Sequence, residues 1–221
     1  MTESNDRIVI VCTANVIRSP FVAGLLSTRM PARLSGHVTI ASAGTLARSG
    51  MPADPRLVEL GRTYGLDLDP HRSQRLDEGV LRAGDTVLCA ERNHRRVVLD
   101  LRPDLISSVF TLREFSRLLE ADQGRASHWA GVVEAASRER LAGRGARDED
   151  DDVVDPVGGP DEAWLAFERQ ATQAVSTILG VMAALPAPDR SASSEAPLSS
   201  RREYRRSRGA VTVDRRSARR G

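Results

Sequence analysis

Short apolar runs alternate with segments of helical periodicity along most of the chain. Four apolar runs have the length and continuity typical of strands buried on both faces: residues 7–11, 38–41, 86–89 and 108–110. Five segments repeat apolar residues at helical spacing and predict helices: residues 19–30, 54–60, 94–101, 112–119 and 160–185. Strands that alternate with helices favour a parallel sheet covered by helices on both faces, so we predict an α/β fold.

Two stretches depart from this alternation. Residues 122–152 end in a run of acidic residues and predict an extended, partly flexible insertion. Residues 187–221 are rich in Ser, Arg and Pro and contain too few apolar residues to bury a core, so we predict a disordered, arginine-rich tail. We therefore expect one domain over residues 1–186, which includes the insertion, followed by the tail.

The charge is divided unevenly between these two parts. The chain has a net charge of +2, and all 32 of its basic residues are arginine. Residues 187–221 contain ten arginines and four acidic residues, a net charge of +6, which leaves the remainder at −4. A tail of this kind can dock on acidic partners, nucleic acid or anionic lipid. An unconstrained disordered end is the simpler interpretation.

Composition and cysteine usage exclude several classes of protein. The sequence contains no run of about 18 apolar residues, so we expect no membrane span. It begins with MTESNDRIVIV, which lacks the basic segment of a secretory signal. Two cysteines, Cys12 and Cys89, are too few for a disulfide framework and lack zinc-ligand spacing. We expect a cytoplasmic protein that uses no metal and no cofactor.

The first predicted strand leads into a helix through a turn with the chemistry of an anion site. Residues 12–20 read Cys-Thr-Ala-Asn-Val-Ile-Arg-Ser-Pro. A turn at the carboxyl end of a parallel strand presents backbone N–H groups above a helix N-terminus, where anions bind. Cys12 at its base would lie in positive potential, which favours the reactive thiolate. Arg18 could donate two parallel hydrogen bonds to phosphate, and Ser19 could donate one to the sulfur.

A cysteine followed six positions later by an arginine is a weak pattern in a chain so rich in arginine. Residues 89–95, Cys-Ala-Glu-Arg-Asn-His-Arg, have the same spacing and also follow a predicted strand. This second match places Glu91 where its charge would repel phosphate, and no hydroxyl residue follows Arg95. We expect Cys89 to be structural and Cys12 to be the reactive cysteine.

The longer pattern around Cys12 resembles the low-molecular-weight protein tyrosine phosphatases, whose turn reads approximately V-C-x-G-N-x-C-R-S-P. The resemblance extends over about residues 7–120 and 150–185. It includes three further segments: Ser42-Ala43-Gly44-Thr45, His71-Arg72 and Val154-Asp155-Pro156. It implies a three-layer α/β sandwich whose four-stranded parallel sheet, flanked by helices, has the strand order 2-1-3-4.

The resemblance also implies a mechanism. Cys12 takes the place of the nucleophile that forms a cysteinyl phosphate, Arg18 that of the phosphate clamp, and Asp155 that of the acid that protonates the leaving oxygen. The phosphate-binding loop would consist of Thr13, Ala14, Asn15, Val16, Ile17, Arg18 and Ser19. The supporting hydrogen-bond network would consist of Asn15, Ser19, Ser42 and His71. The partner implied is a phosphorylated protein substrate, and the oligomeric state is left open.

Other residues in these segments offer weaker candidates. Asp151 and Asp152 are alternative acids, but only Asp155 is followed by a proline. The remaining histidines, His37, His94 and His128, are expected to be surface residues.

Three departures from the family pattern change the expected chemistry. Ala14 replaces a glycine, which requires a negative φ at that position. Ile17 replaces a second loop cysteine that could trap an oxidised nucleophile as a disulfide. Residues 157–159, Val-Gly-Gly, come after Asp155 and Pro156, where the family often places aromatic residues that flank a substrate ring.

These departures leave more than one function open. We expect hydrolysis of phosphotyrosine on proteins. Gly158 and Gly159 also resemble the related protein-arginine phosphatases, although Val16 stands where those enzymes typically have threonine. A non-catalytic phosphate-binding adaptor is a further alternative. An arsenate reductase needs additional cysteines to relay oxidising equivalents, which Cys89 alone cannot supply.

Overall fold

The computed structural model describes residues 6–121, 126–143 and 151–187. The described residues contain a four-stranded, wholly parallel sheet with the order β2-β1-β3-β4. The strands are β1 (Asp6–Cys12), β2 (Val38–Gly44), β3 (Thr86–Cys89) and β4 (Val109–Thr111). Each strand falls on an apolar run identified in the sequence, so the predicted fold class and strand order are confirmed.

Five of the described α-helices lie close to the predicted segments, and α5 (Trp129–Leu141) is an additional one. The helices are α1 (Arg18–Arg29), α2 (Pro55–Thr63), α3 (Arg92–Leu101), α4 (Leu112–Ala121), α5 and α6 (Asp161–Ala184), with a short 3₁₀ helix at Pro103–Leu105. The start of α2 shows a local cause: Asp54 accepts a hydrogen bond from the Arg56 backbone N–H at 2.9 Å. Pro55, which has no N–H to satisfy, occupies the first helical position.

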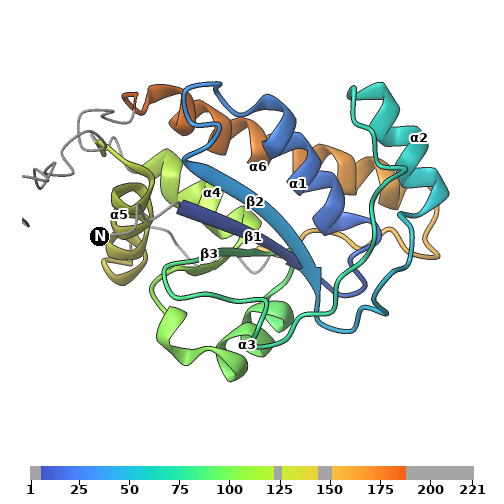
Figure 1. The fold of residues 1–221 in the computed structure, drawn as a ribbon, viewed down its shortest axis with the longest axis horizontal. Coiled ribbons are helices and arrows are strands. Elements are labelled where there is room, and N and C mark those ends of the chain that lie inside the picture. The colour runs from blue at the N-terminus through green and yellow to red at the C-terminus, as the bar shows by residue number, and fades with distance from the viewer. Residues whose placement is uncertain (1–5, 122–125, 144–150, 188–221) are drawn as a thin grey trace, which may run out of the picture. The chain divides into compact units, whose positions relative to one another are not determined.

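Alternate side chains of β1 belong to two separate cores, one on each face of the sheet. Ile8 and Ile10 pack in the larger core, with residues from α1, α4, α5 and α6. Val9 and Val11 pack in the smaller core, to which α3 contributes Val98. In Figure 1, α1 and α6 lie above the sheet and α3 lies below it. The sheet is therefore covered on both faces, as the continuous apolar character of its strands requires.

The expectation that residues 122–152 are an extended connection is wrong for the middle of that segment, which forms α5. Trp129, Val132, Val133 and Ala136 recur at helical spacing and are all buried. The Trp129 indole N–H also donates to the Thr86 hydroxyl at 3.0 Å, which ties the helix to β3. This periodicity was present in the sequence, but the acidic run after it suggested a polar linker.

The predicted tail, residues 187–221, lies outside the described residues except for Ala187. Its disorder and the boundary of the domain at residue 186 stay predictions. Within residues 6–121, 126–143 and 151–187, no helix combines the length and apolar character needed to cross a membrane.

Candidate active site

Residues 13–17 join β1 to α1 at the carboxyl edge of the sheet. Carbonyl groups of this loop, and that of the last residue of β1, accept hydrogen bonds from surrounding segments. Four carbonyl oxygens accept hydrogen bonds from outside the loop: Cys12 from the Thr45 N–H (2.9 Å), Thr13 from the Leu46 N–H (2.8 Å), Asn15 from His71 Nε2 (2.7 Å) and Val16 from the Asp54 N–H (3.0 Å). In a trans peptide the N–H points opposite to the carbonyl oxygen. The N–H groups of the same peptides therefore point away from these partners.

The N-terminus of α1 adds to this arrangement. No side chain caps the helix, and its first turn contains no acidic residue. The first N–H groups of a helix have no partner within the helix, and the helix dipole places partial positive charge there. The loop and the helix N-terminus together form a cradle suited to an anion such as phosphate.

Cys12 ends β1 at the base of this cradle. Its Sγ lies 3.3 Å from the Asn15 backbone N–H, which donates to it, and 3.0 Å from the Ser19 hydroxyl. The residue is only 3% exposed. Two hydrogen-bonding groups therefore already face the sulfur, in the positions that would stabilise negative charge on it.

The four residues of the predicted supporting network are brought together by the structure. Asn15 Nδ2 donates to Ser19 Oγ at 2.8 Å and to Ser42 Oγ at 2.9 Å. Asn15 Oδ1 accepts a hydrogen bond from the Gln74 backbone N–H at 2.7 Å, and the Asn15 backbone carbonyl accepts one from His71 Nε2. Asn15 is wholly buried, and its side chain is satisfied at both ends. Gln74 is a member of this network that sequence reasoning did not identify.

The loop needs one unusual backbone conformation, and Asn15 adopts it. Among the described non-glycine residues, Asn15 alone has a positive φ, of 54°. Asparagine tolerates this left-handed conformation better than most residues. Ala14, which replaces a glycine of the family pattern, does not adopt a positive φ. Its methyl group is therefore compatible with the loop.

Gly44 at the end of β2 lies directly against the loop. A Cβ atom at this position would come within 2.6 Å of the Thr13 carbonyl oxygen and 2.8 Å of the Asn15 nitrogen. These are backbone atoms that are themselves hydrogen-bonded, so they have little freedom to move. The close approach of the two backbones requires glycine here.

Arg18 lies at the start of α1 with its guanidinium buried among polar partners. Nη2 donates to Thr13 Oγ1 at 3.0 Å and to Asp155 Oδ2 at 2.6 Å. Nη1 donates to the Val153 carbonyl oxygen at 3.1 Å and also to Glu91. The side chain is 3% exposed. Arg18 therefore joins the phosphate cradle to Asp155, which is 137 residues later in the sequence.

Asp155 differs from the two other acids considered in the sequence. Asp151 accepts hydrogen bonds from Arg117, and Asp152 accepts the Arg92 backbone N–H at 2.8 Å. Asp155 alone among the three contacts Arg18, and its side chain is 40% exposed. Its carboxyl group can therefore reach both the cradle and a molecule that arrives from solvent.

Glu91 is a site residue that the sequence analysis considered only within its own loop. Its charge was expected to disfavour phosphate near Cys89, but its carboxylate binds Arg18. β1 and β3 are neighbours, with Val11 opposite Cys89, so the residues after each strand meet at the same sheet edge. That adjacency is the signal that could have revealed the contact.

His94 is the second residue that was missed, and the expectation that it is a surface residue is wrong. It is 4% exposed, and its Nε2 lies 2.9 Å from Thr13 Oγ1. Thr13 Oγ1 also accepts from Arg18 Nη2, so the hydroxyl lies between the two side chains. Burial, the largest cause, lowers the pKa of His94, and nearby Arg18 lowers it further against the opposing effect of Glu91.

The second cysteine match has no comparable cradle. Cys89 is fully buried in the smaller core, whereas Cys12 belongs to the larger core on the other face of the sheet. Burial raises the pKa of the Cys89 thiol. Arg95 donates to the Val109 carbonyl oxygen at 3.2 Å. The geometry therefore favours Cys12 over Cys89 as a nucleophile.

Comparison with protein families and curated sequences gives concordant results. Residues 7–125 match the model of the family described as low molecular weight phosphotyrosine protein phosphatase. The probable low molecular weight protein-tyrosine-phosphatase EpsP of Ralstonia nicotianae is 34% identical over 118 residues, which cover 53% of this chain and 78% of EpsP. The protein-arginine-phosphatase of Geobacillus stearothermophilus is 30% identical over 160 residues, 72% of this chain and 84% of that protein.

Solved structures show the same fold. A low molecular weight protein tyrosine phosphatase from T. tengcongensis matches with a TM-score of 0.56 at 25% identity, covering 80% of this chain and 99% of that one. A YwlE mutant from Bacillus subtilis matches with a TM-score of 0.58 at 23% identity, with the same coverage.

Proposed function

The chain belongs to the low molecular weight phosphotyrosine protein phosphatase family, and we propose that it hydrolyses phosphotyrosine on proteins through a cysteinyl-phosphate intermediate. One observation carries the proposal. The buried guanidinium of Arg18 connects the loop around Cys12 Sγ to the carboxyl group of Asp155. A nucleophile, a phosphate clamp and an acid are thereby gathered around one anion cradle.

In the first step the Cys12 thiolate attacks phosphorus. The S–P bond forms as the bond between phosphorus and the phenolic oxygen breaks. Asp155, in its protonated form, gives its proton to the departing oxygen, which leaves as a neutral phenol. Arg18 and the loop N–H groups bind the three non-bridging oxygens and stabilise their charge in the transition state.

In the second step a water molecule attacks the phosphorus of the cysteinyl phosphate. Asp155, now a carboxylate, accepts a proton from this water, while the S–P bond breaks and the thiolate is restored. The Ser19 hydroxyl, 3.0 Å from Sγ, stabilises the departing thiolate by donating a hydrogen bond. Inorganic phosphate is the second product.

The rim of the site favours an apolar substrate side chain. Leu46, whose N–H bonds the loop, is 67% exposed, and Val157, two residues after Asp155, is 62% exposed. These aliphatic groups can pack against an aromatic ring without the stacking that an aromatic residue would provide. Phosphoarginine is the second candidate substrate. It is supported by the match to the Geobacillus protein-arginine-phosphatase and by Gly158 and Gly159.

The substrate assignment predicts a difference between two matched peptides. The protein should hydrolyse p-nitrophenyl phosphate with inhibition by vanadate, and its kcat/KM should be on the order of ten-fold higher for a phosphotyrosyl peptide than for the phosphoarginyl peptide of the same sequence. The reverse ratio would assign it as a protein-arginine phosphatase. Binding of phosphate without turnover would indicate an adaptor, and arsenate-dependent consumption of thiol would indicate a reductase.

Oxidation provides a second prediction. Hydrogen peroxide should inactivate the enzyme, and dithiothreitol should restore little of the activity. Ile17 occupies the loop position where a second cysteine could trap the oxidised nucleophile, and Cys89 lies in the core on the other face of the sheet. Oxidised Cys12 therefore has no disulfide partner among the cysteines of the chain, and it can proceed beyond sulfenic acid. The measurement is residual hydrolysis of p-nitrophenyl phosphate before and after dithiothreitol.

The variant Ile17→Cys is the matched control for this experiment. A cysteine at position 17 should make inactivation by peroxide largely reversible. Full recovery of the unsubstituted enzyme in dithiothreitol would contradict the prediction.

A further inference from the structure

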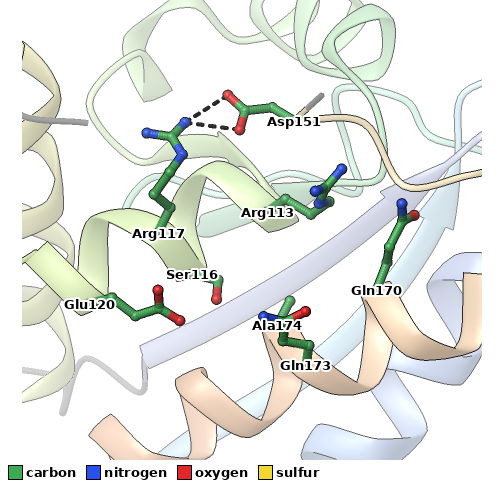
Figure 2. A pocket seen from close by; sticks show the side chains of 8 residues that line it. All are labelled: Arg113, Ser116, Arg117, Glu120, Asp151, Gln170, Gln173 and Ala174. Carbon is green, nitrogen blue, oxygen red and sulfur yellow. Dashed lines mark hydrogen bonds and ion pairs between the residues drawn. The ribbon is translucent and has the colours of Figure 1, made fainter. Parts of the chain in front are cut away.

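A polar cavity of about 170 Å³ lies between α4 and α6, and one end of the segment that carries Asp155 lines it. Figure 2 shows Arg113 and Arg117 projecting from α4, Gln170 from α6, and Asp151 from the segment that enters between them. None of these side chains has a role in the proposed chemistry. The side chains from α4 and α6 instead contact residues 151–154, which immediately precede Asp155.

The strongest of these contacts joins Arg117 to Asp151. Arg117 Nη2 lies 2.9 Å from Asp151 Oδ1 and 2.8 Å from Oδ2, and Figure 2 draws both interactions. The Asp151 side chain is 12% exposed and that of Arg117 28% exposed. Solvent screens such a pair much less than a fully exposed one, so the contact can hold the chain in place.

The neighbouring residues of the segment are held by their backbones. Arg113 Nη1 donates to the Asp152 carbonyl oxygen at 3.3 Å, and the Val154 N–H donates to Gln170 Oε1 at 2.9 Å. Residues 151–154 are thus bound to α4 on one side and to α6 on the other. Val153, between them, is 2% exposed and its carbonyl oxygen accepts from Arg18.

The segment changes character directly after these contacts. Asp155, Val157 and Gly158 are exposed, and Gly158 has a φ of +65°. The Asp155 carboxyl group itself is bonded to Arg18 and to the Val157 N–H, while the four residues before it fix the path of the backbone that carries it. A general acid has to lie within hydrogen-bond distance of the oxygen that it protonates, so a small displacement of this segment would weaken proton transfer.

We propose that Arg117 and Gln170 are positioning residues for Asp155, acting through Asp151 and Val154. They fix the acid-bearing segment, so that the Asp155 carboxyl group meets the leaving oxygen. This inference rests on the proposed function, because it concerns the acid of that reaction. It predicts that loss of either contact impairs leaving-group protonation and leaves the phosphate cradle intact.

The test uses aryl phosphates whose leaving phenols cover a wide range of pKa. A phenol of low pKa departs without a proton, whereas phenol itself needs one, so a defect in the acid appears only with poor leaving groups. The variants are Arg117→Met and Gln170→Leu. The quantity measured is kcat/KM, which reports the step in which the phenol departs.

For the variants we expect kcat/KM to fall about ten-fold with phenyl phosphate and less than about two-fold with 2,4-dinitrophenyl phosphate, a part of the 10²–10⁴-fold that general acid catalysis contributes. Asp155→Asn, which removes the acid itself, should show a larger fall of kcat/KM with phenyl phosphate and again a small one with 2,4-dinitrophenyl phosphate. Arg117→Lys, which keeps a positive charge beside Asp151, should recover part of the loss. The inhibition constant of inorganic phosphate should be unchanged, because the cradle is untouched.

Arg62→Met is the matched control, since it removes an exposed ion pair with Asp69, 3.1 Å long, that is remote from this segment. It should not change the dependence on the leaving group. An equal loss of kcat/KM with every aryl phosphate, or no loss with any, would overturn the positioning role. Absence of hydrolysis by the unsubstituted protein would instead overturn the proposed function, and the inference with it.

Discussion

Cys12→Ser should reduce hydrolysis of p-nitrophenyl phosphate by at least about a thousand-fold, as loss of a covalent nucleophile does in other enzymes. A serine hydroxyl is not ionised at neutral pH and is a poorer leaving group than a thiol when the intermediate breaks down. The substitution changes one atom, so Asn15 and Ser19 can keep their hydrogen bonds to it. The measurement is steady-state turnover, with thermal unfolding as the check on folding.

Cys89→Ser is the control for this prediction. Cys89 is fully buried on the other face of the sheet, and burial raises the pKa of its thiol, so it remains protonated. We expect its variant to keep turnover within about two-fold of the original, the range usual for substitutions outside a reacting centre. If a buried hydroxyl lowers the unfolding temperature, Cys89→Ala separates stability from turnover. Loss of activity in the Cys89 variants but not in Cys12→Ser would identify Cys89, and not Cys12, as the nucleophile.

Arg18→Lys should lower kcat/KM by about 10³-fold, the lower end of the range for an arginine that stabilises a transferring phosphoryl group. The planar guanidinium donates in a fixed fork that matches two phosphate oxygens, which would replace some of the acceptors that its Nη hydrogens bind in the unliganded site. The ammonium group of lysine is a point charge on a flexible stem and cannot reproduce this geometry. Kinetics on p-nitrophenyl phosphate measure the loss.

Arg29→Lys offers a matched control in the same helix. Arg29 lies in the last turn of α1, where it contacts the exposed carbonyl oxygen of Tyr64 at 3.3 Å and stacks over the Tyr64 ring. Its replacement should leave turnover unchanged. Equal activity of the two variants would rule out Arg18 as the phosphate clamp.

The sheet and the cradle could be predicted because their determinants are local. Continuous apolar runs specified the strands, and residues 12–20 contained the cysteine, the turn, the arginine and the helix start in one stretch. The left-handed conformation of Asn15 has its cause in the same stretch, since asparagine is among the few residues that accept it.

Contacts between distant segments could not be predicted in the same way. Glu91 was interpreted together with its own strand, whereas its carboxylate crosses to Arg18 because β1 and β3 are adjacent. His94 was interpreted as a surface residue, but its place in the first turn of α3 turns it toward Thr13. The sequence indicates which residues come after each strand, but it does not show which of their side chains meet above the sheet edge.

The cavity between α4 and α6 is likewise formed by segments that are distant in the sequence. Its members come from residues 113–120, 151 and 170–174, three segments that no single pattern joins. The acidic run before Asp155 looked like a solvated linker, yet Asp151 and Asp152 are both bound to arginines. An acidic residue in a polar stretch is therefore an ambiguous sign, because its partner is set by tertiary packing.

The missing side chain at Gly44 bears on how this enzyme could acquire new substrates. Backbone atoms of the loop occupy the space where any other residue would place its Cβ, so the floor beneath the phosphate is closed to mutation from that direction. Leu46 and Val157, by contrast, are exposed and can change size or polarity at little cost to folding. Diversification of this scaffold, by evolution or in the laboratory, is thus directed to its entrance rather than to the backbone contact at Gly44.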